Sequence, residues 1–292
     1  MIVVTAPTGH IGGHLVNALL DAGEPVRVVV RDPARLAPGV AARAEVVTGS
    51  HADAAVVAKA FAGADAVFWL VPADPRAASV DEAYSGFARP ALEVFASQGV
   101  GRVVGVSALG RGTPVADRAG YVTGTLAMDD LIAATGVPYR ALVMPSFMDN
   151  TARQTAAIRS QGVFSGPIAP DLRAPVVATR DIAAVAARLL RDGTWTGFAE
   201  VPVLGPEDLT HAEMAATIAS VLGREVRYQH VTGEALYAVR PGMSPAMARG
   251  LLDMAIAKNE GLDNGVARTP EWTTPTTFRQ WCTDVLKPAV DG

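Results

Sequence analysis

Short runs of β-branched and apolar residues alternate with helical patterns over the first half of the chain. Six such runs predict buried parallel strands, at residues 2–4, 26–30, 45–48, 66–70, 102–107 and 139–144. Apolar residues at helical spacing predict helices between them, at residues 54–61, 80–97 and 128–134 among others. Pro90 is expected to kink or restart the second of these. The alternation predicts an α/β fold with a doubly wound parallel sheet.

The rhythm changes after Asn150. Helices are expected at residues 151–158, 182–190 and 210–222, a loop at 162–167 and a strand at 201–204. Asp181 could cap the second of these helices, and Thr210 with Glu213 has the spacing of a capping box. Phe278 and Trp281 fall on one face of a last helix. We therefore expect a nucleotide-binding domain at residues 1–150 and a smaller α+β substrate region at 151–292, partly packed back on the sheet.

Composition excludes several classes of protein. The chain has 292 residues, of which 50% are apolar and 18% charged, as in a globular enzyme. Its net charge of −4 and the lack of a basic cluster disfavour nucleic-acid binding. No apolar segment is long enough to span a membrane, and no signal peptide precedes the first strand. Cys282 is the only cysteine, which is consistent with a reducing cytoplasm. We expect a cytoplasmic monomer or homodimer.

The turn after the first strand has the spacing of a nucleotide-binding loop. Ala6, Gly9 and Gly12 occupy a G-x-x-G-x-x-G register with alanine in first place. The turn follows a strand and opens an amphipathic helix, so small residues would let the backbone approach a diphosphate near the helix N-terminus. No Lys-Ser or Lys-Thr follows the glycines, which excludes the loop of nucleoside triphosphatases.

The tip of the second strand indicates which coenzyme is bound. An acidic residue there would bind the 2′-hydroxyl of NAD, whereas an arginine accommodates the 2′-phosphate of NADP. Arg31 stands at this tip and Arg35 follows one turn later, which favours NADP(H) over NAD(H). Asp32 could pair with either arginine, and the alternative is that all three are solvated loop charges. The tip of the third strand, at Ser50, should lie near the adenine.

Several blocks together resemble the NmrA-like family of atypical short-chain dehydrogenases/reductases. They read TAPTGHIGGHL, VVVRDPARL, GVPYRALVMPSFMDN, ATRDIAAVAARLL and PTTFRQW, and they extend along nearly the whole chain. The resemblance implies a Rossmann domain that binds NADP(H) or NAD(H) and a smaller C-terminal substrate domain. Members of the family include quinone reductases, isoflavone-type reductases and redox-sensing regulators that bind the coenzyme without turnover.

Two sets of contacts are expected on this basis. The cofactor-binding residues are Thr5, Ala6, Thr8, Gly9, His10, Ile11, Gly12, Arg31, Arg35, Ser50, Leu70, Val71, Pro72, Ser107 and Pro145. The substrate-lining residues are Phe147, Met148, Asn150 and Phe164. Such an apolar lining suits a small apolar or aromatic substrate, although core packing explains these side chains equally well.

The catalytic residues depart from the family pattern. Where these reductases often carry an active-site lysine, this chain has Thr125, one helical turn after Tyr121. A lysine there would lower the pKa of the tyrosine and hold the nicotinamide ribose, and threonine has no charge to do so. Tyr121 could still donate a proton as a neutral phenol, helped by Ser107, or it could be a pocket wall.

Other chemistries find less support. Gly105-Val106-Ser107 lacks the second glycine of a hydrolase elbow. His10 and His14 have a zinc-compatible spacing but no glutamate between them, so no metal is expected. Three further histidines and three aspartates suggest structural roles, solvation or helix capping: His51, His211, His230, Asp129, Asp130 and Asp149.

The function expected from these features is that of an NADP(H)-dependent oxidoreductase, which reduces a small apolar carbonyl, quinone or enone. One alternative is a non-catalytic NADP(H) sensor with a protein partner, favoured by the threonine at position 125. Another is a biosynthetic cyclase or isomerase built on the same fold.

Overall fold

The computed structural model describes residues 1–237 and 242–292, which divide into two compact units. The first unit comprises residues 1–107, 124–143 and 182–201, and the second comprises residues 108–123, 144–181 and 202–292. The domain boundary expected at residue 150 would separate two domains that fold independently, and it stays a prediction.

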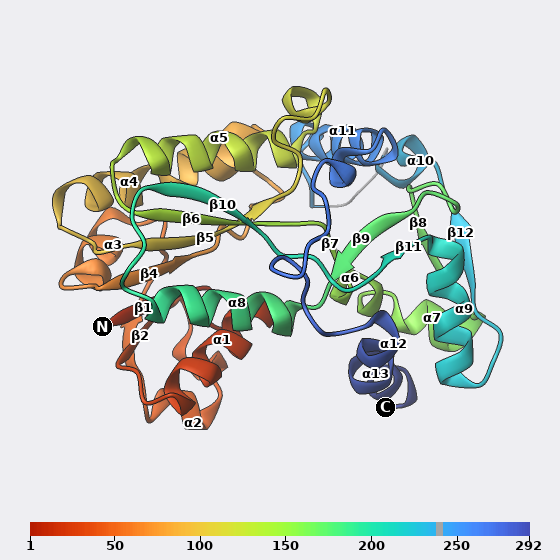
Figure 1. The fold of residues 1–292 in the computed structure, drawn as a ribbon, viewed down its shortest axis with the longest axis horizontal. Helices are drawn as coiled ribbons and strands as arrows, with labels where there is room; N and C mark the ends of the chain where they lie inside the picture. Colours follow the sequence, from red (N-terminus) through yellow and green to blue (C-terminus); the bar gives the residue numbers. More distant parts are fainter. Residues whose placement is uncertain (238–241) are drawn as a thin grey trace. The chain divides into compact units, whose positions relative to one another are not determined.

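A parallel sheet forms the centre of the first unit (Figure 1). Within the described residues it has seven strands in the order β10-β6-β5-β4-β1-β2-β3. Ile2 of β1 lies opposite Val26 of β2 on one side and Ala66 of β4 on the other, so the first strand is central. The strands are β1 (Ile2–Thr5), β2 (Val26–Val30), β3 (Glu45–Thr48), β4 (Ala66–Trp69), β5 (Val103–Ala108), β6 (Tyr139–Met144) and β10 (Phe198–Pro202). The expected doubly wound α/β sheet is confirmed.

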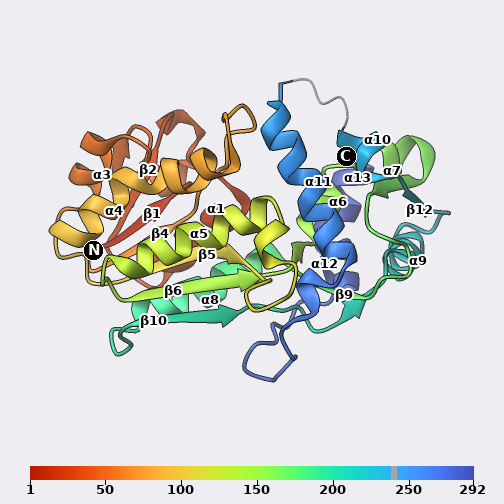
Figure 2. The same cartoon turned by 90° about the horizontal axis from the view of Figure 1, so that it is seen from above.

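Helices cover both faces of this sheet, which is why every residue of β1 and β4 is buried. Figures 1 and 2 show α3 (Ala54–Phe61), α4 (Phe87–Ser97) and α5 (Tyr121–Ala134) on one face, and α1 (His10–Asp21) and α8 (Thr179–Arg191) on the other. The short helix α2 (Pro38–Ala41) follows a 3₁₀ turn at Pro33–Arg35. A π-helical segment, Glu82–Gly86, leads into α4, so the helix changes type shortly before Pro90.

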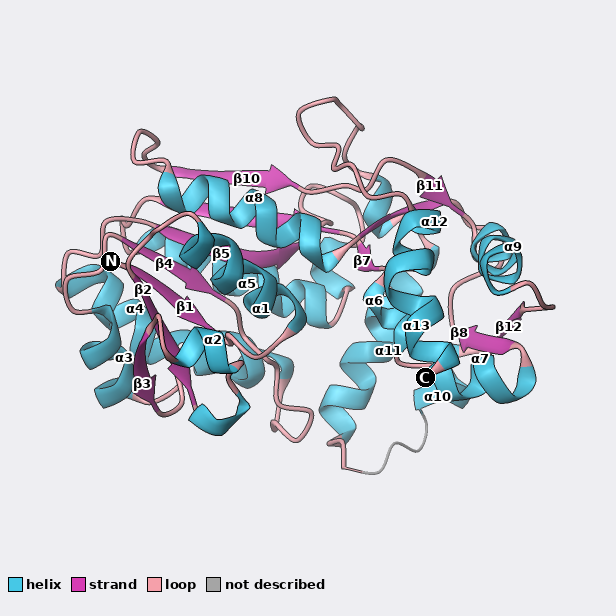
Figure 3. Ribbon diagram, turned by 90° about the horizontal axis from the view of Figure 1, so that it is seen from below, coloured by secondary structure: helices cyan, strands magenta, loops and turns pink. Residues whose placement is uncertain are grey.

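Two small sheets and a set of helices form the second unit (Figure 3). β7 (Ser146–Phe147), β9 (Ala174–Val177) and β11 (Asp208–Leu209) make one sheet, and β8 (Val163–Gly166) pairs in parallel with β12 (Arg227–His230). The helices are α6 (Asp149–Ala152), α7 (Thr155–Gln161), α9 (His211–Leu222), α10 (Gly233–Tyr237), α11 (Pro245–Asn259), α12 (Phe278–Trp281) and α13 (Lys287–Asp291). There are also 3₁₀ turns at Ala116–Arg118 and Leu262–Asn264 and a π segment at Cys282–Leu286.

Three local predictions for the second half of the chain differ from the structure, one in the type of element and two in the bounds. Residues 162–167 are not a loop, because Val163–Gly166 pairs with a strand more than sixty residues later. The strand expected at 201–204 begins at Phe198 and belongs to the sheet of the first unit. The helix expected at 151–158 is divided into α6 and α7.

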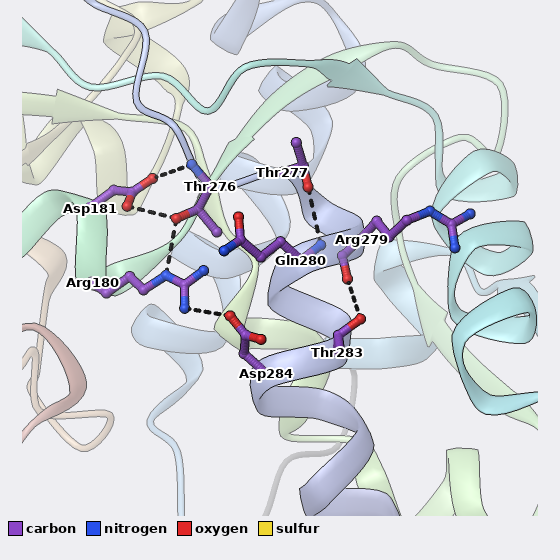
Figure 4. A network of polar contacts seen from close by, with 8 residues as sticks. All are labelled: Arg180, Asp181, Thr276, Thr277, Arg279, Gln280, Thr283 and Asp284. Carbon is purple, nitrogen blue, oxygen red and sulfur yellow. Dashed lines mark hydrogen bonds and ion pairs between the residues drawn. The ribbon is translucent and has the colours of Figure 1, made fainter.

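Asp181 does not cap α8, contrary to the expectation. The helix begins two residues earlier, at Thr179, whose amide and hydroxyl donate to the carboxylate of Asp149. Asp181 instead accepts hydrogen bonds from the amide of Thr276 at 3.0 Å and from its hydroxyl at 2.8 Å (Figure 4). Arg180 donates to the same hydroxyl at 3.0 Å and pairs with Asp284. This network fixes the C-terminal segment to the start of α8.

Other predictions for this half are confirmed. The capping box is present, since Thr210 and Glu213 exchange hydrogen bonds at the start of α9. Phe278 and Trp281 are both buried and stack with their ring centres 5.6 Å apart. They belong to an apolar core that includes Met148, Phe164 and Ile218.

Candidate functional site

The turn between β1 and α1 exposes backbone at a helix N-terminus. Thr8, Gly9 and His10 are exposed, and the N-cap is Gly9, which has no side chain to accept from the first amides of α1. No acidic residue lies in the first turn of this helix. An exposed helix start without a carboxylate favours an anionic ligand such as a diphosphate.

Gly12 sets how closely this turn approaches the helix. A Cβ atom built on Gly12 would lie 2.2 Å from the carbonyl oxygen of Ala6 and 3.0 Å from the Cα atom of Pro7. Both contacts are with backbone, so no other side chain fits without moving the turn. Ala6 itself has a φ of 50°, which in an L-residue costs about 1–2 kcal/mol. The turn is therefore tightly packed and slightly strained.

The predicted cofactor residues at the carboxyl ends of the strands differ in burial and in hydrogen bonding. The buried hydroxyl of Thr5 donates to the carbonyl of Phe68 at 2.9 Å and accepts from the amide of Leu70 at 3.0 Å. Its hydroxyl therefore connects the ends of β1 and β4. The Ser50 hydroxyl accepts from the amide of Ala52 at 3.2 Å. Ile11 is buried, whereas Val71 is partly exposed and Pro72 exposed. Pro145, after β6, is buried in the second unit.

Arg31 and Arg35 are both exposed, beyond the end of β2. Asp32 does not pair with either arginine, because it caps the following 3₁₀ turn and accepts from the amide of Ala34 at 3.1 Å. Within the described residues, neither guanidinium has an ion-pair partner. Two free cations at the tip of the strand beside β1 fit a 2′-phosphate, and the close-packed turn fits a diphosphate. The residues present thus fit a pyridine dinucleotide.

His51 supports this edge of the sheet from inside. It is 7% exposed, its Nε2 atom lies 2.9 Å from the carbonyl oxygen of Leu70, and its ring meets Trp69 and Phe87 edge-on. Burial lowers the pKa of His51 to about 4, with a smaller contribution from the charge of Arg31, and the hydrogen bond with Leu70 opposes the shift only in part. The imidazole is therefore neutral at neutral pH, in agreement with the structural role expected for it.

Ser107 belongs to a buried polar cluster that the sequence did not indicate. Its hydroxyl donates to the carboxylate of Asp129, which also accepts from the phenol of Tyr139. Asp129 is fully buried, so the suggestion that it is solvated or caps a helix was wrong. These partners come from β5, α5 and β6, at sequence separations of 22 and 10 residues, and no local pattern marks such a cluster.

Thr125, at the usual lysine position, is buried and hydrogen-bonded to Tyr84. Burial raises the pKa of Tyr84, and the hydrogen bond from Thr125 partly opposes that shift. A neutral hydroxyl therefore occupies the place where a charge would lower the pKa of a catalytic tyrosine. Tyr121, the first residue of α5, is partly buried. Its catalytic role stays a prediction.

Three of the four predicted substrate residues line one cavity in the second unit. Phe147, Asn150 and Phe164 border a space of about 160 Å³, whereas Met148 is 1% exposed in the apolar core. The same cavity is lined by polar residues that the sequence did not single out, among them Lys258 and Asp263. Lys258 lies in α11 and Asp263 in the turn after it, about one hundred residues from the predicted set.

Two negative findings concern the described residues. They hold no group of three or more histidine, cysteine or acidic side chains placed to bind a metal ion. None of their helices combines the length and the apolar character that crossing a membrane requires.

Comparison with protein families and curated relatives agrees with this geometry. The family model described as NAD(P)H-binding matches residues 7–193. The (4-alkanoyl-5-oxo-2,5-dihydrofuran-3-yl)methyl phosphate reductase of Streptomyces griseus is 33% identical over 289 residues, which cover 96% of each chain. The match therefore extends through both units.

Two solved structures share the fold. An NADPH-dependent quinone oxidoreductase from Escherichia coli superposes with a TM-score of 0.75 at 21% identity, covering 96% of this chain and 98% of that one. The transcriptional regulator NmrA in complex with NADP gives a TM-score of 0.75 at 15% identity, covering 99% and 96%. With the family match, these likenesses confirm the expected resemblance to the NmrA-like reductases.

Proposed function

The chain belongs to the NAD(P)H-binding family, and from that premise we propose that it is an NADPH-dependent reductase of a small apolar carbonyl, quinone or enone. The observation that carries the proposal is the exposed turn at the start of α1, packed on Gly12, with Arg31 at the tip of the adjacent strand. The Streptomyces relative is named a reductase and matches this chain over nearly its whole length, which supports the reaction class.

The preference for NADPH over NADH rests on the two arginines. Arg31 and Arg35 present guanidinium groups that match the geometry of a phosphate. The Oδ1 atom of Asp32 is engaged as a cap by the amide of Ala34. A 2′-phosphate would therefore gain attraction at this strand tip, whereas an unphosphorylated ribose would gain little.

In this reaction the chain mainly binds and orients the coenzyme and the substrate. A reduced nicotinamide supplies the hydride when bound. The amides near Gly9 would hold the diphosphate, and Arg31 would hold the adenosine end. Tyr121 donates the proton as a neutral phenol, because Thr125 offers no charge to lower its pKa. Quinones and enones need less help from a strong general acid than simple ketones do, which makes them the favoured substrates.

Consumption of NADPH against a panel of quinones, enones and aldehydes tests the proposal. We expect turnover with at least one quinone or enone, slower turnover with simple ketones, and weaker use of NADH throughout. Tyr121→Phe should slow ketone reduction more than quinone reduction, because only the ketone depends on the donated proton. Absence of turnover with the whole panel, at saturating NADPH, would contradict it.

One observation favours a second function, that of an NADP(H) sensor without catalysis. Thr125 is buried against Tyr84 instead of supplying the positive charge typical of the catalytic pair. Tight binding of NADP with no turnover on any compound of the panel would identify this function. The two functions share the coenzyme site and differ only in the chemistry that follows binding.

A further inference from the structure

A cavity in the second unit has the size of one aromatic ring. It measures about 160 Å³ and lies among residues of α6, α9, α11 and the small sheets. Its apolar wall is formed by Phe147, Phe164, Leu172, Val176, Leu209 and Met214. An apolar protein cavity of about 150 Å³ is known to hold benzene, so the space accommodates a single ring with small substituents.

A buried ion pair borders this cavity. Lys258 donates to the Oδ2 atom of Asp263, and their side chains are only 14% and 7% exposed. The opposite charges cancel, so the pocket carries no net charge from them. An anionic ligand would have to approach the Asp263 carboxylate as closely as the Lys258 ammonium. The pocket therefore favours a neutral compound over a phosphate or carboxylate.

One oxygen of this ion pair is not satisfied. The Oδ1 atom of Asp263 is buried and has no hydrogen-bond partner among the described residues. A buried carboxylate oxygen is stabilised by a donor, and leaving it without one is costly. The Asp263 side chain lines the cavity, so a ligand whose hydroxyl or N–H group reaches this atom would supply the missing donor.

A second polar atom without a partner borders the same space. The Nδ1 atom of His211 is buried and has no hydrogen-bond partner in the described part of the chain. The imidazole packs against Tyr228 in a tilted arrangement, with ring centres 4.5 Å apart. Burial lowers the pKa of His211 to about 4, and the charge of His230 acts in the same direction. The ring is therefore neutral at neutral pH and adds no charge to the pocket.

We propose that this cavity binds a neutral single-ring compound that donates a hydrogen bond to the Oδ1 atom of Asp263, and that carbonyl compounds of this kind are among the substrates of the reductase. The second clause rests on the proposed function, whereas the first stands on the cavity itself. The unpartnered oxygen selects for a hydroxyl or N–H group, the cancelled charges select against anions, and the volume suits a single ring.

Calorimetric titration with three aldehydes tests the binding, both without coenzyme and with saturating NADP⁺. 3-Hydroxybenzaldehyde carries the donor, 3-methoxybenzaldehyde lacks it, and 3-carboxybenzaldehyde is anionic. We expect the hydroxy compound to bind at least about tenfold more tightly than either of the others, the effect of one hydrogen bond to a charged group. Equal affinities, or no binding of any compound under either condition, would overturn the proposal.

A double variant identifies the residue responsible. Lys258→Met with Asp263→Leu removes both charges together, which avoids leaving one of them buried alone. The ratio of hydroxy to methoxy affinity should then fall to about 1. The matched control is Arg249→Met with Asp253→Leu, which removes an ion pair of α11 that does not line the cavity. This control should keep the wild-type ratio of hydroxy to methoxy affinity. A ratio that survives in the first variant would contradict the assignment to Asp263.

Measuring NADPH consumption beside ligand binding distinguishes a failure of this proposal from a failure of the function on which it rests. If 3-hydroxybenzaldehyde shows the predicted binding but NADPH is not consumed with it or with the wider panel, the pocket assignment holds and the reductase proposal fails. If NADPH is consumed with quinones while the three aldehydes bind equally, the reductase stands and the pocket proposal fails.

Discussion

Gly12→Ala should impair coenzyme binding far more than the addition of one methyl group suggests. The added methyl carbon would begin 2.2 Å from the carbonyl oxygen of Ala6, and relief requires the turn and α1 to separate by roughly 1 Å. Overpacking of this kind costs about 1–3 kcal/mol, and the better helix propensity of alanine offsets about 1 kcal/mol of it. The free energy of unfolding should therefore fall by at most about 2 kcal/mol.

The effect on coenzyme binding should be larger because the displaced turn carries the amides that we propose hold the diphosphate. Losing one hydrogen bond to a charged group weakens binding by about 1.5–3 kcal/mol, or about 10- to 100-fold in Kd. Titration of the purified variant with NADPH, beside thermal unfolding to show that it is folded, measures both quantities.

The matched control is the next residue along the helix. A Cβ atom on Gly13 would lie 3.7 Å from the carbonyl oxygen of Pro7, an ordinary contact, so Gly13→Ala should leave the Kd unchanged within about twofold. The reasoning is refuted if the two variants bind NADPH equally well, or if Gly13→Ala is the weaker binder.

Three further predictions concern other parts of the chain. Arg31→Ala should weaken NADPH binding by about tenfold or more and NADH binding by less than about twofold, since only NADPH has a 2′-phosphate; equal losses in titrations would contradict the coenzyme assignment. The pKa of His51 is about 4 in the folded protein against 6.5 as reference, so the unfolded chain takes up the extra proton between these values. The contribution of the neutral imidazole to the free energy of unfolding is complete above about pH 6.5 and is lost towards pH 4, at about 1.4 kcal/mol per pH unit. Over this range the free energy of unfolding, measured in urea, should fall less steeply with decreasing pH for His51→Gln than for the wild type. Thr276→Val should lower the free energy of unfolding by about 1–3 kcal/mol, because Asp181 loses a buried donor, whereas Thr276→Ser should keep most of it; equal unfolding midpoints for the two variants would count against the network.

The sequence predicted the first half of the chain well because its signals are local. β3 and α3 have the expected bounds, Glu45–Thr48 and Ala54–Phe61, and β6 ends just before Pro145 as anticipated. A continuous β-branched run between two helical patterns has few alternatives when both faces of the sheet are covered. The turn at Ala6 follows from the same logic, since the spacing of its small residues is visible in the sequence.

The second half depends on distant partners, and there the sequence was less informative. Val163–Gly166 looks like a loop until Arg227–His230 pairs with it. Asp181 has the position of a helix cap, but Thr276, nearly one hundred residues later, supplies better donors. The buried role of Asp129 likewise requires two hydroxyl groups from other strands. Each of these depends on a contact that no local pattern encodes.

Calorimetric titration of the purified protein with NADPH and with NADH tests the central claim most directly. The geometry of the turn at Gly12 and of Arg31 predicts saturable binding of one NADPH per chain, with NADH bound at least about tenfold more weakly. No heat of binding with either coenzyme would contradict the assignment of this turn as a dinucleotide site.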